Sequence, residues 1–309
     1  MAAPLRAQGP RVHAHRGASS RCPENTMAAF LEARRLGADA VELDVHATAD
    51  GHVVVLHDYD LARTTSGTGL VHERDLAYVR SLSAGAWFGP EFEEERVPLL
   101  SEVLGLDGLG FELEVKGLPA PGLLDGIAKA VRAAGAADRA LLTGPHLVAL
   151  AGLGALLPGA KLGLFPQPFQ PWMTDHLYEQ LLTHSALSGG FELVYVPAAQ
   201  LAKLDVGRIH NQGIAVQVLV PPQDEQSEDF VASVFAQGAD GVTINEPEVA
   251  IQARARSSSW PGRGPITSAC PRASQVGSPP ARPETATAGH PQPGSAIAIC
   301  KGALPLGRT

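Results

Sequence analysis

Residues 40–46 read Ala-Val-Glu-Leu-Asp-Val-His, so that apolar and charged side chains alternate along the segment. In a β-strand every second side chain lies on the same face. Glu42, Asp44 and His46 therefore share one face of the predicted strand, and aliphatic side chains occupy the other. A single strand of this kind is also compatible with a solvent-exposed antiparallel edge, so the neighbouring strands decide its interpretation.

Two further predicted strands repeat the charged face. Their polar side chains are His13 and His15 in the run 12–17, and Glu112, Glu114 and Lys116 in the run 110–116. Three such strands argue against an exposed edge and favour a barrel, in which the apolar face packs on helices and the charged face turns inward. Interior charges are costly unless they are paired or bind a metal.

Short apolar runs alternate with helical stretches along the chain, about 20–30 residues apart, which is typical of βα units in a parallel sheet. The predicted strands are 12–17, 40–45, 53–57, 110–115, 140–142, 161–165, 193–196, 215–220 and 241–245. Asp50-Gly51 indicates a hairpin between the second and third runs, and a helix is expected from Asn25-Thr26 to Gly37. The rhythm predicts a TIM (β/α)8 barrel. An open doubly wound sheet is the alternative, disfavoured because no glycine-rich phosphate loop follows a strand.

The chain is expected to contain one folded region, residues 11–255, after a flexible N-terminus at 1–10. Residues 58–98 interrupt the rhythm and predict a small insertion after the second strand. The tail, 256–309, has 9 Pro and 7 Gly in 54 residues, a composition that predicts disorder. The tail carries six basic side chains against Glu284, which leaves −13 for residues 1–255 of a chain whose formal charge is −8.

Composition excludes several classes of protein. The acidic balance argues against nucleic acid as a partner, and no apolar run is long enough for a membrane span. The first residues lack the apolar core of a secretory signal, and three scattered cysteines do not make a disulfide scaffold. We therefore expect a cytoplasmic protein. The sequence does not indicate an oligomeric state.

Three of the inward carboxylates, Glu42, Asp44 and Glu114, would repel one another and raise each other's pKa. A divalent cation would remove this repulsion. An all-oxygen ligand set without cysteine suits Mg²⁺ or Ca²⁺ better than zinc. The sequence therefore predicts a metal site at the carboxyl ends of the strands, where TIM barrels hold their active sites.

Two histidines, His15 and His57, end neighbouring runs and are expected at the same rim as the carboxylates. A lone histidine is usually structural, but a pair beside a carboxylate cluster favours acid–base catalysis. Arg16 and Lys116 add cationic groups that would hold a phosphoryl group. Residue chemistry alone thus indicates metal-assisted cleavage of a phosphate ester.

An ordered set of motifs also carries a family resemblance. In chain order they are His15-Arg16-Gly17, Pro23-Glu24-Asn25-Thr26, Glu42-Leu43-Asp44-Val45, His57-Asp58, Arg63-Thr64-Thr65, Val97-Pro98-Leu99, Glu114-Val115-Lys116, Gly238-Ala239-Asp240-Gly241 and Asn245-Glu246-Pro247. This set, over about residues 11–250, resembles the glycerophosphodiester phosphodiesterase family. Single motifs such as His-Arg-Gly are weak, whereas the ordered set is highly specific.

The resemblance implies a TIM barrel that hydrolyses glycerophosphodiesters, small molecules of lipid and glycerol metabolism, to glycerol 3-phosphate and an alcohol. It implies that the metal ligands are Glu42, Asp44 and Glu114, that the acid–base pair is His15 and His57, and that Arg16 and Lys116 bind the phosphate. It leaves open which histidine is the acid and which the base, the metal, and the preferred head group.

Some positions depart from the family pattern. Residues 142–145 and 219–222 lack the Ser-Phe and Trp-Thr pairs usual after the fourth and seventh strands, and His13 stands where an aliphatic residue is usual. The aromatic side chains on nearby loops are expected either to replace that surface or, more simply, to pack: Trp87, Phe88, Phe169 and Trp172. Glu112 is expected either to support the metal site or to lie deeper in an ion pair.

Three alternative functions remain at this point. The same barrel supports a lysophospholipase D or a phosphoinositide-type phosphodiesterase, the former favoured by an exposed apolar rim, of which the loops show no strong sign. A non-catalytic barrel that binds phosphate ligands is the third. It is disfavoured because both histidines are present.

Overall fold

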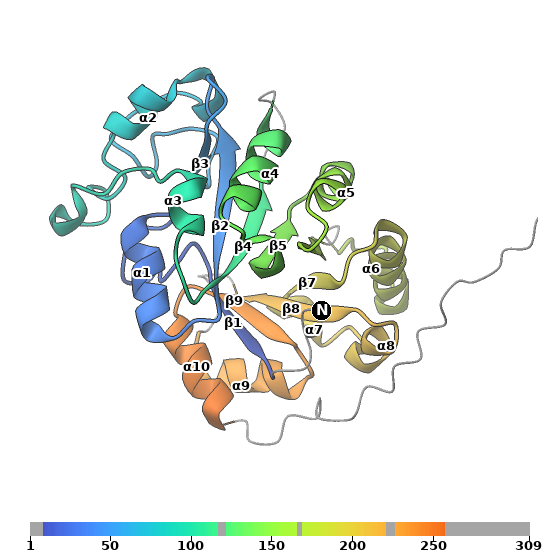
Figure 1. The fold of residues 1–309 in the computed structure, drawn as a ribbon. Coiled ribbons are helices and arrows are strands. Elements are labelled where there is room, and N and C mark those ends of the chain that lie inside the picture. Colours follow the sequence, from blue (N-terminus) through green and yellow to red (C-terminus); the bar gives the residue numbers. More distant parts are fainter. Residues whose placement is uncertain (1–8, 117–121, 166–168, 221–225, 257–309) are drawn as a thin grey trace, which may run out of the picture. The chain divides into compact units, whose positions relative to one another are not determined.

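A closed barrel of eight parallel strands with flanking helices forms the centre of the fold, here described from a computed structural model (Figure 1). The structure describes residues 9–116, 122–165, 169–220 and 226–256. The strands are β1 (Arg11–Ala14), β2 (Ala40–Ala47), β3 (Val53–Val55), β4 (Gly110–Val115), β5 (Ala140–Thr143), β6 (Lys161–Leu164), β7 (Leu193–Pro197), β8 (Ala215–Val220) and β9 (Gly241–Ile244). Pairing of β1 with both β2 and β9 closes the barrel, so the predicted TIM barrel is confirmed.

The helices pack on the apolar outer faces of the strands, and together they form the main hydrophobic core. They are α1 (Met27–Leu36), α2 (Leu76–Ser81), α3 (Leu100–Leu104), α4 (Leu123–Ala133), α5 (Leu147–Leu156), α6 (Asp175–Gly189), α7 (Ala198–Leu201), α8 (Val206–Asn211), α9 (Glu228–Ala236) and α10 (Pro247–Arg256). Within the described residues, no helix is long and apolar enough to span a membrane.

Strand β1 ends earlier than predicted. Strand β1 ends at Ala14 rather than Gly17, because Arg16 (φ 57°) and Gly17 (φ 84°) leave the β region. Helix α1 begins and ends where the sequence predicts. Thr26 accepts a hydrogen bond from the Ala29 N–H as its N-cap, and Gly37 ends it in the left-handed conformation.

The hairpin predicted at Asp50-Gly51 is present, and it places β3 outside the barrel. Strand β3 runs antiparallel to the last three residues of β2, Val45–Ala47. The segment that follows contains α2 and two short 3-10 turns, η2 (Val71–Glu73) and η3 (Pro90–Phe92). It buries its own apolar cluster, which includes Leu61, Val71 and Val97. This is the small insertion expected after the second strand.

The last helix of the barrel is tied to its first strand. Arg254 of α10 donates a hydrogen bond to the carbonyl of Pro10 (3.2 Å) and forms an ion pair with Asp39. Contacts divide the chain into residues 1–264 and 265–309, and the second unit lies outside the described residues. The predicted flexible N-terminus, 1–10, and disordered tail, 256–309, lie outside the described residues except at their inner ends. There the carbonyl of Pro10 accepts a hydrogen bond from Arg254, and Arg256 belongs to α10, so the folded region extends slightly beyond the predicted 11–255.

Candidate functional site

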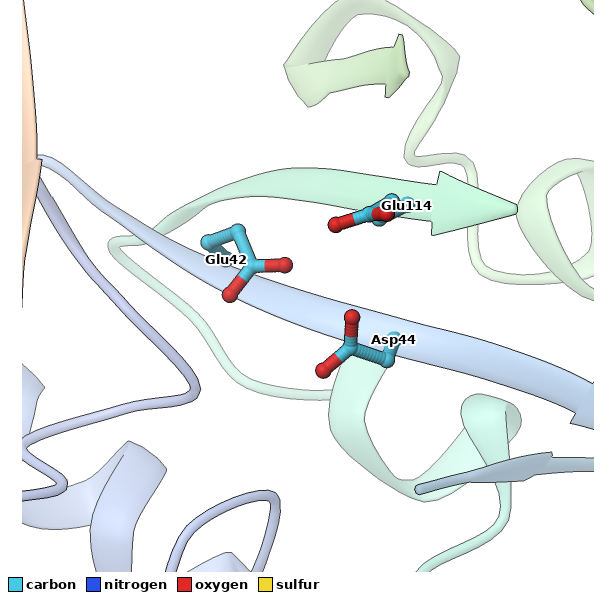
Figure 2. Close-up of side chains that lie close together, drawn as sticks. All are labelled: Glu42, Asp44 and Glu114. Atoms are coloured by element: carbon cyan, nitrogen blue, oxygen red, sulfur yellow. The ribbon is translucent and has the colours of Figure 1, made fainter. Parts of the chain in front are cut away.

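Three carboxylates from two adjacent strands converge inside the barrel. The register places Asp44 of β2 opposite Glu114 of β4, with Glu42 one pleat below Asp44. Each contributes an oxygen that lies within 4.8 Å of the others, and Figure 2 shows the carboxylates turned toward one another. Glu42 and Asp44 are buried, and Glu114 is partly exposed. The structure thus brings together the three residues predicted as metal ligands.

Proton affinities differ across this cluster. Burial, followed by the charge of Asp44, raises the pKa of Glu42 well above its ordinary value and that of Glu114 to about 7. Burial acts in the same sense on Asp44, but Lys116 and Arg16 hold the pKa of Asp44 below its ordinary value. Without a cation, Glu42 and Glu114 therefore bind protons more tightly than ordinary carboxylates do, whereas Asp44 binds its proton less tightly.

A hard divalent cation fits this set of donors. Glu42 Oε1 is buried and has no hydrogen-bond partner among the described residues. Oxygens on opposite sides of a cation with bonds of about 2.3–2.6 Å lie about 4.6–5.2 Å apart. The separations here fall within that reach, and a bound cation would satisfy the orphan oxygen of Glu42.

Two cationic side chains border the carboxylates. Lys116 Nζ donates to Glu114 Oε1 (2.6 Å) and lies 3.1 Å from Asp44 Oδ1. The backbone N–H of Arg16 donates to Glu42 Oε2 (2.9 Å), and its side chain binds Glu24 Oε1 (2.8 Å). Both positively charged groups predicted to bind phosphate therefore lie beside the cluster.

His15 lies in the turn after β1 with its ring against the same cluster. Its Nδ1 lies 2.7 Å from Asn245 Oδ1, which can only accept, so Nδ1 carries the proton. The other nitrogen, Nε2, lies 4.0 Å from Glu42 Oε2. Burial, with a contribution from the charge of Arg16, lowers the pKa of His15 to about 4. His15 is therefore neutral at pH 7, with an unprotonated Nε2 beside the carboxylates.

His57 follows the hairpin strand β3, as predicted, and lies two residues beyond the end of that strand. Strand β3 ends at Val55 and returns antiparallel along β2, so that the Leu56 N–H donates to the Asp44 carbonyl (3.0 Å). His57 Nδ1 then donates to Asp58 Oδ1 (2.6 Å), and His46 Nε2 lies 3.1 Å from the His57 carbonyl. A carboxylate partner stabilises the protonated imidazolium, which an amide oxygen does far less.

Comparison with known proteins assigns the chain to a family. A sequence profile described as "Glycerophosphoryl diester phosphodiesterase family" matches residues 15–144. A glycerophosphodiester phosphodiesterase of Caldanaerobacter subterraneus subsp. tengcongensis is 34% identical over 247 residues, which cover 78% of this chain and 96% of that one. The chain belongs to the glycerophosphodiester phosphodiesterase family.

A second glycerophosphodiester phosphodiesterase and a solved phosphodiesterase structure agree with this assignment. One from Bacillus altitudinis is 30% identical over 252 residues, 79% of this chain and 98% of that one. The solved structure of an Oleispira antarctica phosphodiesterase, in complex with the product sn-glycerol-3-phosphate, superposes with a TM-score of 0.66 at 26% identity and covers 79% and 96% of the two chains. The chain is accordingly an enzyme, a phosphoric diester hydrolase.

Two residues of this site, Asn25 and Arg63, belong to the family's sequence motifs but were not predicted to take part in the site. Asn25, at φ 57°, donates from Nδ2 to Asp44 Oδ2 (2.8 Å), and its Oδ1 accepts from the Asp44 N–H (3.3 Å). Arg63 bridges Glu24 (2.8 Å) and Asp58 (2.6 Å), and so links the partner of Arg16 to the partner of His57. The motifs containing Asn25 and Arg63 were the only signal, because neither contact follows from strand periodicity.

A second polar layer lies below the carboxylates in the barrel interior. Glu112 Oε2 lies 2.6 Å from His13 Nδ1 and accepts from Thr243 Oγ1 (3.4 Å), to which Gln217 donates in turn (3.0 Å). Glu112 also adds to the negative charge that raises the pKa of Glu42. The alternative expected for Glu112, a deeper ion pair, is the one this contact shows.

The aromatic loop residues divide between packing and exposure. Trp87 packs edge-to-face on Phe88, and Phe169 packs on Tyr178 and under the ammonium of Lys203. Trp172 is instead 69% exposed. It lies in the loop before α6, next to Met173, which lines an apolar cavity together with side chains of α6.

Proposed function

We propose that this enzyme hydrolyses glycerophosphodiesters to glycerol 3-phosphate and an alcohol, with a divalent cation at Glu42, Asp44 and Glu114. The observation that supports it is the convergence of this carboxylate triad with two histidines whose partners differ. When bound, Mg²⁺ or Ca²⁺ would neutralise phosphoryl oxygens as charge develops on them. Arg16 and Lys116 lie beside the triad and would bind the remaining phosphoryl oxygens.

The two histidines divide the proton transfers in this proposal. His15 Nε2 is unprotonated and accepts the proton of the attacking hydroxyl as the new P–O bond forms. Attack by water gives glycerol 3-phosphate directly, whereas attack by the glycerol hydroxyl gives a cyclic phosphate that a water molecule then opens to glycerol 3-phosphate. His57, as an imidazolium held by Asp58, donates its Nε2 proton to the leaving alkoxide as the ester P–O bond breaks. The Asn245 and Asp58 contacts orient the two rings for these opposite roles.

The decisive experiment is a panel of head groups and cations. Glycerophosphocholine, glycerophosphoethanolamine and glycerophosphoglycerol are each incubated with the metal-free enzyme and with added Mg²⁺ or Ca²⁺. We expect glycerol 3-phosphate to be released only when a cation is present. Absence of release with every head group and cation would instead support the alternative of a non-catalytic phosphate-binding barrel.

An apolar cavity of about 140 Å³ favours a lysophospholipase D activity as a second candidate. Its lining includes Pro145 after β5 and Phe165 after β6, at the carboxyl-end face of the barrel that also holds Glu114. Val148 is 89% exposed nearby on α5. This cavity and Val148 supply an apolar rim, of which the loop sequences show no strong sign, and the rim offers a surface for an acyl chain.

Lysophosphatidylcholine and glycerophosphocholine distinguish the two candidates, since they share a head group and differ in the acyl chain. Lysophospholipase D is favoured if the KM for lysophosphatidylcholine is lower than that for glycerophosphocholine. A Phe165→Ser variant should then raise the KM for the lysolipid and leave the kinetics with glycerophosphocholine unchanged. Equal kinetics for the lysolipid in the unaltered and Phe165→Ser enzymes would remove this candidate.

The cytoplasmic location stays a prediction, tested by cell fractionation.

A further inference from the structure

A cavity of about 300 Å³ lies at the amino-terminal ends of the barrel strands. Its lining includes the first residue of each of five strands: Arg11, Ala40, Gly110, Ala140 and Lys161. Asp44 and Glu114 extend from the carboxyl-terminal halves of β2 and β4, whereas this cavity opens at the first residues of the same strands. Ala40 and Gly110 are small, which leaves room between the longer side chains.

Two cationic side chains meet in this cavity without a carboxylate between them. Lys161 is partly buried and makes no hydrogen bond or ion pair within the part of the chain that the structure describes. The guanidinium of Arg11 makes one long hydrogen bond, 3.5 Å to the carbonyl of Asp39. Burial, and then the charge of Arg11, lowers the pKa of Lys161, and the charge of Glu192 opposes this without reversing it. The proximity of the two cations is therefore unfavourable, and an anion between them would relieve it.

A buried histidine adds an unused polar group to the same wall. His13 is 3% exposed, and its Nδ1 is bound to Glu112 while Nε2 has no partner among the described residues. Buried polar atoms are seldom left without a partner unless a ligand or water supplies one. His13 stands where the family usually has an aliphatic side chain, so this feature belongs to the chain rather than to its catalytic machinery.

The remaining charged groups of the lining do not cancel the two cations. Arg139 donates to the carbonyls of Leu106 and Leu109, both at 3.0 Å, and adds a third positive charge. Asp39 accepts from the Val12 N–H (2.7 Å) and is neutralised by Arg254. Asp138 is exposed in η4 (Ala137–Arg139) at the edge of the cavity, and it leaves the local balance positive.

We propose that this cavity is a second anion site that binds a phosphate group between Arg11 and Lys161, with His13 as a further contact. The cations extend from β1 and β6, which are not neighbours in the barrel. A tetrahedral phosphate presents oxygens in several directions and can bind both at once, whereas a planar carboxylate is suited to a single fork. The source of the phosphate is either the free anion or a small phosphate monoester such as glycerol 3-phosphate.

Calorimetric titration of the full chain, kept metal-free with EDTA, tests the proposal with inorganic phosphate and glycerol 3-phosphate as separate probes. We expect one phosphate per chain. Lys161→Gln and Arg11→Gln should each weaken binding at least ~10-fold, the scale of one charge-assisted hydrogen bond. Tighter binding of glycerol 3-phosphate would identify a monoester as the ligand, and equal binding would identify the free anion.

Two lysines provide matched controls. Lys129→Gln, on the exposed side of α4, should leave the affinity for phosphate unchanged. Lys116→Gln should weaken only phosphate bound at the proposed active site, and should leave the binding that depends on Lys161 unchanged. The thermal unfolding temperature without phosphate should not fall in Lys161→Gln, because among the described residues its side chain makes no hydrogen bond or ion pair and faces the charge of Arg11. Arg11→Gln serves if that variant fails to fold. The proposal is overturned if no phosphate binds, if Lys116→Gln abolishes binding while Lys161→Gln does not, or if malonate binds as tightly as phosphate.

Discussion

At the scale of single residues, the two imidazoles differ in what holds them: an amide oxygen for His15 and a carboxylate for His57. This difference predicts separate defects. Both His15→Ala and His57→Ala should lower kcat for glycerophosphocholine at least ~10²-fold. With a p-nitrophenyl glycerophosphodiester, whose leaving group needs no protonation, His57→Ala should recover most of its rate and His15→Ala should not.

Steady-state kinetics with the two substrates check this assignment. Asp58→Asn provides the matched control, because it keeps a hydrogen-bond partner for His57 and removes the charge. Its defect should resemble that of His57→Ala in substrate dependence. If the nitrophenyl substrate rescues His15→Ala instead, the acid and base roles are reversed.

Proton binding by the carboxylates predicts a pH-dependent metal affinity. Glu114, with a pKa of about 7, and Glu42, also raised, must release protons when a cation binds. The lowered pKa of Asp44 means that it contributes no such proton. The Kd for Mg²⁺ or Ca²⁺ should therefore fall about tenfold or more per pH unit between pH 5.5 and 7.

Calorimetry in buffers of different ionisation enthalpy counts these protons directly. Glu42→Ala should bind the cation more weakly and release fewer protons per cation than the unaltered enzyme. A Kd that stays constant across this pH range, or cation binding that Glu42→Ala leaves intact, would contradict the ligand assignment.

At the scale of elements, the turn between β1 and α1 depends on Gly17. Its φ of 84° disfavours other residues, and an added Cβ would lie 2.6 Å from the Cβ of Ala29 in α1. Gly17→Ala should therefore lower the free energy of unfolding by roughly 1–3 kcal/mol. Urea denaturation measures the change.

A second glycine is the control for this substitution. Gly152 lies exposed in α5, and an added Cβ would meet nothing within 4 Å. Gly152→Ala should raise the free energy of unfolding by roughly 0.5–1 kcal/mol, since alanine favours helix. Equal effects of the two substitutions would show that the turn geometry is not the cause.

Local patterns in the sequence were sufficient for elements whose causes are local. Alternation along β2 predicted which side chains face the interior, and Thr26 and Gly37 predicted the limits of α1. The Asp50-Gly51 turn likewise predicted the hairpin that pairs β3 antiparallel with β2, although β3 ends at Val55, two residues before His57. Contacts such as His15 with Asn245 join residues 230 positions apart, and no local periodicity encodes them.

At the scale of the whole molecule, we predict that residues beyond the barrel are dispensable for catalysis. Helix α10 ends the described chain at Arg256, and its buried residues Ala250 and Ala253 belong to the core. A chain that ends at Arg256 should keep its kcat/KM and its thermal unfolding temperature. A chain that ends at Glu246, and so lacks α10, should unfold at a markedly lower temperature. Loss of activity in the chain that ends at Arg256 would refute the prediction.

The ion pair of Arg254 with Asp39, and its hydrogen bond to Pro10, bring the last helix of the barrel against its first strand. The βα units are therefore arranged in a closed ring, so the fold could in principle begin at any of them. A short linker from residue 256 to residue 9 would make a circular permutant feasible, with new termini opened in an exposed loop such as the one around Gly135. Strands β9 and β1 would then follow each other in the chain. The pairing that closes the barrel after synthesis would be that of β4 with β5 instead of β9 with β1.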